Sequence, residues 1–218
     1  MHATRQTYQA INLALFDFDG TLCRRSDSFT GFIFYTLSKR HIMRQGLKIL
    51  PWIQAYYLKL YPAHQMRPKL FSAMFKDSNA KNIHSMAEQY AHLLVHQLNP
   101  ELLRRLRQHQ AQGDDVVIVS ASIDLYLEPF CRLLGVDLIC TETEVHQGKL
   151  SGFYSSPDCS CEQKKLRIQE KYTLTDYQSV YAYGNSYEDL EMFSLADYCY
   201  MVGEDAELPT LAPIKKLA

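Results

Sequence analysis

The sequence predicts an α/β protein with a doubly wound parallel sheet, and three observations support this prediction. Almost continuously apolar runs of strand length recur along the chain, for example at residues 11–18 and 115–120. Segments with apolar residues at helical spacing lie between these runs, and polar residues follow the runs directly. Strands that alternate with helices favour a parallel sheet covered on both faces. A ligand is then expected beyond the carboxyl ends of the strands.

The first predicted strand, residues 11–18 (INLALFDF), ends in an acidic cluster. From Ser28 to about Leu98 the pattern changes, because glycine is rare after Gly46 and apolar residues recur at helical spacing. We interpret this stretch as several helices that form an inserted domain. The predicted domains are therefore a core, residues 1–22 and 99–218, and an inserted helical cap, residues 23–98.

The core resumes after the insertion with clear helix boundaries. Asn99 is suited to cap a helix, Pro100 fits its first turn, and Gly113 ends it. Further elements are then predicted in this order: a strand at 115–120, a helix at 123–134, a strand at 136–140, a hairpin at 141–153 that turns at Gln147–Gly148, a helix at 161–171, a strand at 179–184 and a helix at 188–195.

Composition and charge exclude several classes of function. A formal net charge of −1 over 218 residues gives no general attraction to nucleic acid, so no nucleic-acid partner is expected. The start of the chain shows no secretory signal, and six scattered cysteines favour reduced thiols in a cytoplasmic protein. The sequence leaves the oligomeric state open.

The most apolar run, residues 47–61 (LKILPWIQAYYLKLY), contains Lys48, Pro51 and Lys59 and is shorter than the ~20 residues that a membrane span needs. No transmembrane segment is therefore predicted. Its mixture of aromatic and lysine residues also suits a helix that lies on a membrane surface. A helix buried within the small helical domain is the favoured interpretation over such peripheral contact.

Polar side chains gather at three predicted strand ends. Asp17 and Asp19 follow the first strand, Ser120 ends the second, and Asn185 and Asp189 follow the last. These ends converge in a parallel sheet. Two carboxylates two residues apart can share one metal ion and still have separate roles. Uncompensated charge at the end of a buried strand is costly, which favours a functional site over a capping turn.

Four segments in the same order resemble the motifs of the haloacid dehalogenase (HAD) superfamily. They are FDFDGTL at 16–22, VIVSAS at 117–122, CEQKKLRI at 161–168 and YGNSYEDLEMF at 183–193. The helical insertion after the first motif is similar to that of the phosphoserine phosphatase-like branch, subfamily IB. The resemblance covers the whole predicted core and implies a HAD-like fold with a helical cap.

The resemblance also implies a role for each matching residue. The first aspartate, Asp17, would be the nucleophile and Asp19 the general acid and base. The phosphate-binding residues would be Ser120, Ala121 and Lys164. A Mg²⁺ ion would be held by Asp17, Asp19, Asn185 and Asp189.

These roles imply a Mg²⁺-dependent phosphatase that hydrolyses a small phosphorylated metabolite through an aspartyl-phosphate intermediate. An aspartate at position 19 favours phosphoryl chemistry, since dehalogenases need no acid for the leaving group there. The alternatives are a lipid-phosphate phosphatase and a weakly active or non-catalytic phosphate-binding protein. Transfer of the phosphoryl group to an alcohol instead of water also stays open.

Two positions leave the assignment of roles open. The fourth motif begins Gly184–Asn185 in place of the usual Gly-Asp, so the site carries one negative charge fewer. An amide oxygen can still bind Mg²⁺, but the division of roles between Asn185 and Asp189 is undecided. Lys164 is preferred over its neighbour Lys165 only because of its place in the motif.

Overall fold

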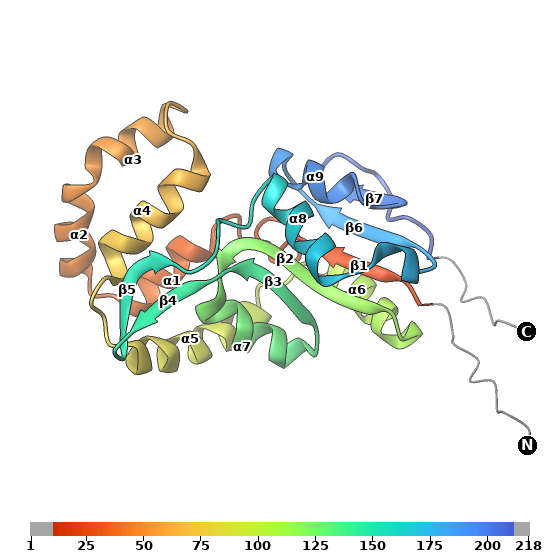
Figure 1. The fold of residues 1–218 in the computed structure, drawn as a ribbon, viewed down its shortest axis with the longest axis horizontal. Helices are drawn as coiled ribbons and strands as arrows, with labels where there is room; N and C mark the ends of the chain where they lie inside the picture. The colour runs from red at the N-terminus through yellow and green to blue at the C-terminus, as the bar shows by residue number, and fades with distance from the viewer. Residues whose placement is uncertain (1–10, 212–218) are drawn as a thin grey trace, which may run out of the picture.

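The computed structural model describes residues 11–211, and a five-stranded parallel sheet forms its centre (Figure 1). The order of the strands confirms the predicted doubly wound sheet, because the chain extends it in both directions from the central strand. In spatial order the strands are β3 (Asp137–Thr141), β2 (Asp115–Ile123), β1 (Leu13–Phe16), β6 (Val180–Gly184) and β7 (Tyr198–Met201).

The central strand β1 is completely buried, which explains its unbroken apolar sequence. Leu13 and Leu15 pack on one face of the sheet, and Ala14 and Phe16 pack on the other. The ring of Phe16 stacks on that of Tyr183 in β6, with the centroids 4.3 Å apart. Two apolar layers therefore fix β1 from both sides, and the loop that follows it starts from a rigid base.

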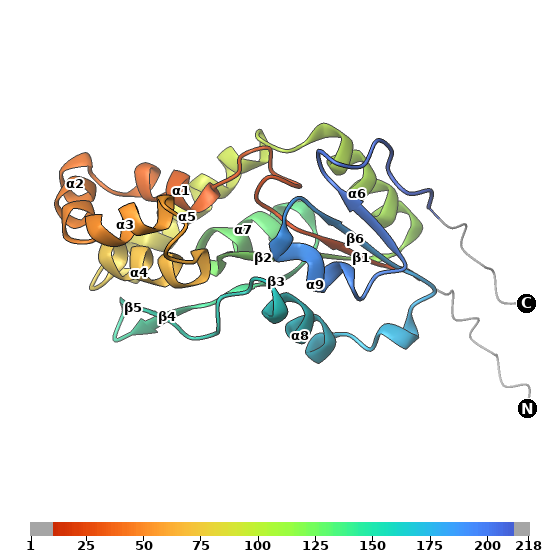
Figure 2. The ribbon, with the colours of Figure 1, turned by 90° about the horizontal axis from the view of Figure 1, so that it is seen from above.

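Helices cover both faces of the sheet. Figure 2 shows α6 on one side and α8 on the other. The apolar layer of Leu102 and Phe130 belongs to α6 and α7, and that of Ile168 and Met192 to α8 and α9. The bounds of these elements are α6 (Pro100–Gln112), α7 (Asp124–Leu134), α8 (Glu162–Lys171) and α9 (Leu190–Phe193), with short 3₁₀ turns at η1 (Leu174–Asp176) and η2 (Tyr187–Asp189).

The predicted insertion is helical, and its first four helices form a group that we call the helical lobe (residues 28–76). Figure 1 shows this lobe beyond the end of the sheet. The fifth helix packs along α7 and so lies beside the core. The helices of the insertion are α1 (Ser28–Thr36), α2 (Lys39–Lys48), α3 (Leu50–Tyr57), α4 (Ala63–Phe75) and α5 (Ala80–Val95).

The apolar run at 47–61 differs from its favoured interpretation as a buried helix. It contains α3, which has no buried residue, and Tyr57 and Leu60 are 79% and 77% exposed. The physical reason is the position of α3, which packs mainly against its neighbours α2 and α4 within the lobe. No helix within residues 11–211 is long and apolar enough to cross a membrane.

The predicted hairpin is present as β4 (Thr143–His146) and β5 (Lys149–Tyr154), which form a separate two-stranded sheet. Its turn lies at Gln147 and Gly148, as predicted, and both have positive φ values of 48° and 74°. This is the backbone of a tight two-residue hairpin turn. The hairpin packs against α4 of the lobe.

The edge strand β7 was not predicted. It pairs in parallel with β6, and Tyr198 is 41% exposed. Its apolar run, residues 198–202, is short and follows directly on the turn after α9, so it was not recognised as a separate strand. The helix predicted at 188–195 is also shorter than expected, because a 3₁₀ turn occupies its beginning.

Candidate active site

The first site residue, Asp17, is fixed by the end of β1. Its backbone N–H donates to the carbonyl of Tyr183 at 2.8 Å and continues the pairing with β6. Its side chain accepts a hydrogen bond from the Thr21 hydroxyl at 2.8 Å. Asp17 is 7% exposed, and the turn through Gly20 and Thr21 holds its carboxylate at the strand ends.

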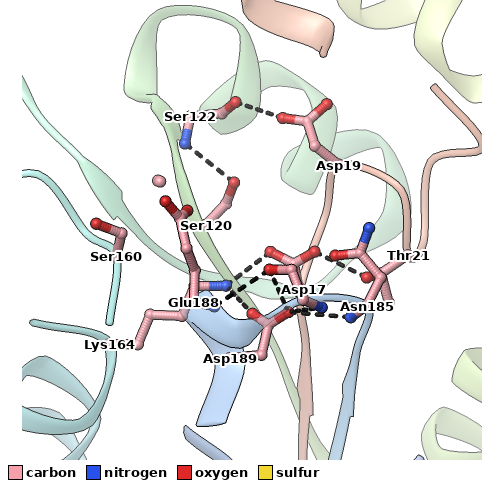
Figure 3. A network of polar contacts seen from close by, with 12 residues as sticks. Asp17, Asp19, Thr21, Ser120, Ser122, Ser160, Lys164, Asn185, Glu188 and Asp189 are labelled. Carbon is pink, nitrogen blue, oxygen red and sulfur yellow. Dashed lines mark hydrogen bonds and ion pairs between the residues drawn. The ribbon is translucent and has the colours of Figure 1, made fainter. Parts of the chain in front are cut away.

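Lys164 from α8 reaches this carboxylate from the opposite direction (Figure 3). Its Nζ lies 2.7 Å from Asp17 Oδ1 and 2.5 Å from Asp189 Oδ1, and the lysine is 1% exposed. Burial raises the pKa of Asp17 to about 6, although the charge of Lys164 opposes this. Burial alone would lower the pKa of Lys164, but Asp17 and Asp189 raise it, so the ammonium form persists.

The second carboxylate, Asp19, points away from Lys164 toward the lobe. One oxygen accepts the backbone N–H of Ser28 at 2.7 Å. The other accepts the hydroxyls of Ser28 at 2.9 Å and Ser122 at 2.6 Å. Burial raises the pKa of Asp19, and these hydrogen bonds oppose the rise. The two aspartates are thus held apart in different surroundings, which suits two different chemical roles.

The loop after β6 is organised by Asp189. One of its oxygens accepts the backbone N–H groups of Asn185 and Ser186, each at 3.0 Å. The Asn185 side chain extends toward Gly20, where an added Cβ atom would lie 2.0 Å from its Nδ2. Gly20 also has a φ of +78°, which L side chains rarely adopt. A glycine is therefore needed here to leave room for Asn185 beside Asp17.

The remaining predicted residues complete one wall. Ser120 and Ala121 lie at the end of β2, and the Ser120 hydroxyl accepts the backbone N–H of Ser122 at 3.1 Å. Lys165 instead pairs with Glu191 at 3.1 Å and is part of a partly exposed surface. All of the predicted site residues line one cavity of about 430 Å³: Asp17, Asp19, Ser120, Ala121, Lys164, Asn185 and Asp189.

One group beside the site could not be found from the sequence. Arg67 of α4 donates to both carboxylate oxygens of Asp158, at 2.7 and 2.8 Å, and to Glu188 at 3.3 Å. Arg67 and Glu188 also line the cavity. Arg67 is separated from Asp158 by 91 positions in the chain and from Glu188 by 121, and no motif connects them. The cluster joins the lobe to the core at the edge of the site.

Comparison with known proteins agrees with this architecture. A family model for haloacid dehalogenase-like hydrolases matches residues 14–194. Protein CicA of Caulobacter vibrioides is 31% identical over 196 residues, which cover 85% of this chain and 83% of the relative. Histidinol-phosphatase of Neisseria meningitidis is 26% identical over 212 residues, which cover 90% of this chain and 92% of the relative.

A solved structure extends the comparison to three dimensions. The crystal structure of a probable phosphoserine phosphatase from Vibrio cholerae superimposes with a TM-score of 0.64 and 18% identity. The superposition covers 86% of this chain and 55% of that one. The chain therefore belongs to the haloacid dehalogenase-like hydrolase family, as its four motifs predicted, and its neighbours within that family include phosphatases.

Proposed function

We propose that this protein is a phosphomonoester hydrolase that works through an aspartyl-phosphate on Asp17. The observation that carries the proposal is the contact between Asp17 and the buried ammonium of Lys164 at 2.7 Å, on the floor of the cavity. A carboxylate beside a fixed cation is placed to attack an anionic phosphate, and the same cation stabilises the phosphate oxygens. Ser120 and Ala121 would bind these oxygens from the other wall.

The proposed reaction has two steps. An Asp17 oxygen attacks phosphorus, the bond from phosphorus to the leaving oxygen breaks, and Asp19 gives that oxygen a proton. Water then attacks the aspartyl-phosphate, Asp19 takes a proton from the water, and inorganic phosphate leaves with Asp17 restored. Proton transfer of this kind typically increases the reaction rate by ~10²–10⁴-fold. The raised pKa of Asp19 favours the protonated form that the first step uses.

We propose Mg²⁺ as the cofactor, because oxygen-bearing side chains of the kind it takes line the same cavity at the strand ends. Asp17, Asp19, Asn185 and Asp189 offer oxygen atoms, the ligands that this hard cation prefers. When bound, Mg²⁺ supplies positive charge that offsets the repulsion between Asp17 and the phosphate. Asp189 already accepts hydrogen bonds at both of its oxygens, so its contribution includes positioning Asn185.

We further propose that residues 23–98 act as the substrate-covering cap. The helical lobe supplies one side of the cavity, and the Arg67 cluster connects it to the core next to the site. A cap in this position would exclude water during formation of the aspartyl-phosphate and select the group that carries the phosphate.

Phosphate release from an aryl phosphate tests the proposal. The natural chain should be active with Mg²⁺ and inactive with a chelator, Asp17→Asn should abolish turnover, and Asp19→Asn should lower it by ~10²–10⁴-fold. Asp176→Asn, at an exposed position in η1, is the matched control and should retain full activity. Turnover that survives Asp17→Asn would refute the assignment of the nucleophile.

The product also separates the alternatives. Phosphate recovered on an added alcohol, at the expense of free phosphate, would indicate a transferase. Phosphate binding without turnover, in a protein that Mg²⁺ fails to stabilise against heat, would favour a non-catalytic phosphate-binding protein.

A further inference from the structure

The lobe side of the cavity is apolar. Where the floor of the cavity carries Asp17 and Lys164, its outer part is lined by side chains such as Ile33, Ile53 and Met66. A cavity of about 430 Å³ is large enough for a ligand well beyond a phosphate group, within the ~300–1,000 Å³ typical of small-molecule sites. The group that carries the phosphate would therefore meet hydrocarbon and aromatic surface.

The cation on the lobe side of the cavity is already paired. Arg67 donates to Asp158 and Glu188 and so is already neutralised by two carboxylates. Asp27 caps α1 by accepting the backbone N–H of Thr30 at 2.8 Å. Among the described residues that line this part of the cavity, no cation is left to pair with a carboxylate on the substrate. This arrangement offers no partner to the carboxylate of an amino-acid phosphate.

The mouth of the cavity opens on the exposed surface of the lobe. Phe34 and Tyr57 both line the cavity, yet they are 63% and 79% exposed. Leu58 and Leu60, which follow α3, are also mostly exposed. An apolar cavity thus opens among apolar side chains that have no cover in the described part of the chain.

Charge on the lobe is unbalanced. Residues 28–76 contain eight Lys or Arg and no Asp or Glu, although the whole chain has a net charge of −1. On α2, the exposed residues Arg40, Met43, Arg44 and Leu47 fall within an arc of about 100° at 3.6 residues per turn. Basic and apolar side chains that share one exposed helix face are typical of helices that lie on anionic lipid.

From these observations we propose that the substrate is a lipid phosphate, a phosphate monoester on a long apolar chain, taken from an anionic membrane surface. The chain lies in the lobe cavity, the phosphate meets Asp17 and Lys164, and α2 and α3 contact the lipid headgroups. This inference rests on the proposed phosphatase activity, and it selects the lipid alternative among the substrates that the sequence left open.

The first test uses soluble n-alkyl phosphates from ethyl to octyl, with phosphoserine for comparison. Each added methylene should raise kcat/KM roughly fourfold until the cavity is filled, the equivalent of about 0.8 kcal/mol per buried CH₂. Phosphoserine should be no better than ethyl phosphate. A flat series, or a preference for phosphoserine, would overturn the inference while leaving the phosphatase proposal intact.

Two variants examine the cavity itself. Ile53→Asn places a polar group on the lobe wall and should lower the octyl-to-ethyl ratio, whereas Leu133→Asn, at an exposed site on α7, should not change it. Calorimetric binding of the same alkyl phosphates to Asp17→Asn gives the chain-length dependence without turnover. If aryl and alkyl phosphates all fail to react, the phosphatase proposal fails, and this binding series still shows whether the cavity takes the alkyl chain of a phosphate monoester.

The second test measures co-sedimentation with vesicles of neutral lipid alone or with one-third anionic lipid. At roughly 1 kcal/mol, or about fivefold, per basic residue near the surface, the double variant Arg40→Gln and Arg44→Gln should bind anionic vesicles roughly 25-fold more weakly. The matched double variant Arg104→Gln and Arg132→Gln, outside the lobe, should bind like the natural chain. Failure of the natural chain to bind anionic vesicles, or equal loss in both double variants, would overturn the membrane part of the inference.

Discussion

Replacement of Lys164 by methionine should strongly destabilise the metal-free protein. The Lys164 side chain is 2% exposed and lies between Asp17 and Asp189, whose side chains are 10% and 1% exposed. Without the ammonium, two buried carboxylates lose their shared cation and repel each other. Removing one partner from a buried pair typically costs about 3–5 kcal/mol, a large share of the ~5–15 kcal/mol that holds most proteins folded.

Urea unfolding in the presence of a chelator, followed by circular dichroism, measures this loss. With a slope near 2.5 kcal/mol per molar urea, the midpoint should fall by about 1–2 M. The matched control is Lys165→Met. Lys165 pairs with Glu191 at 3.1 Å, and the two side chains are 33% and 47% exposed, so its loss should cost at most about 1 kcal/mol.

A double variant sharpens the test. Asp17→Asn combined with Lys164→Met removes one of the two carboxylates as well as the cation, so it should be more stable than Lys164→Met alone. Equal midpoints for Lys164→Met and Lys165→Met would refute the reasoning. Equal midpoints would mean that the buried ammonium of Lys164 contributes no more to the free energy of unfolding than the exposed ammonium of Lys165.

Three further variants examine the surroundings of the site. Gly20→Ala should cost about 1–2 kcal/mol in urea unfolding, because φ is +78° and the new Cβ would collide with Asn185. Asn185→Asp should raise Mg²⁺ affinity roughly tenfold in calorimetric titration, since the added charge attracts the cation, and an unchanged affinity would contradict Asn185 as a ligand. Arg67→Met should increase hydrogen exchange in α4 but not in α6, because Asp158 and Glu188 lose their partner in the lobe.

The site residues at the strand ends were predictable because each lies close in the sequence to a strand that can be recognised from its apolar residues. Asp17 and Asp19 lie next to a buried strand, Ser120 lies near the end of β2 and Asn185 follows β6, so recognising each strand also located its site residue. Parallel pairing then brings these ends to one edge of the sheet. The structure also separates Lys164 from Lys165, a choice that depends on which side of α8 faces Asp17.

The Arg67 cluster and the exposure of residues 47–61 were not predictable, because both depend on contacts between segments that are distant in the sequence. Arg67 meets Asp158 only when the lobe packs beside the core, and nothing in either segment specifies the other. The exposure of residues 47–61 has the same origin. Apolar composition alone favoured burial, but burial needs a partner surface, and α3 lies at the outer end of the lobe, where it packs mainly against α2 and α4.

The residues proposed to bind the phosphate could be recognised from their neighbours in the sequence, whereas the arrangement of the lobe depends on distant segments. Family membership therefore says less about the substrate than about the reaction. The proposed phosphate chemistry uses Asp17, Asp19 and Lys164, and these positions follow from strand ends and one helix. The group that carries the phosphate meets the lobe, whose residues match no shared motif. The names of relatives, such as histidinol-phosphatase, are therefore a weaker guide to the substrate than the cavity wall itself, where Ile53 and Met66 offer apolar surface and Arg67 is paired with Asp158.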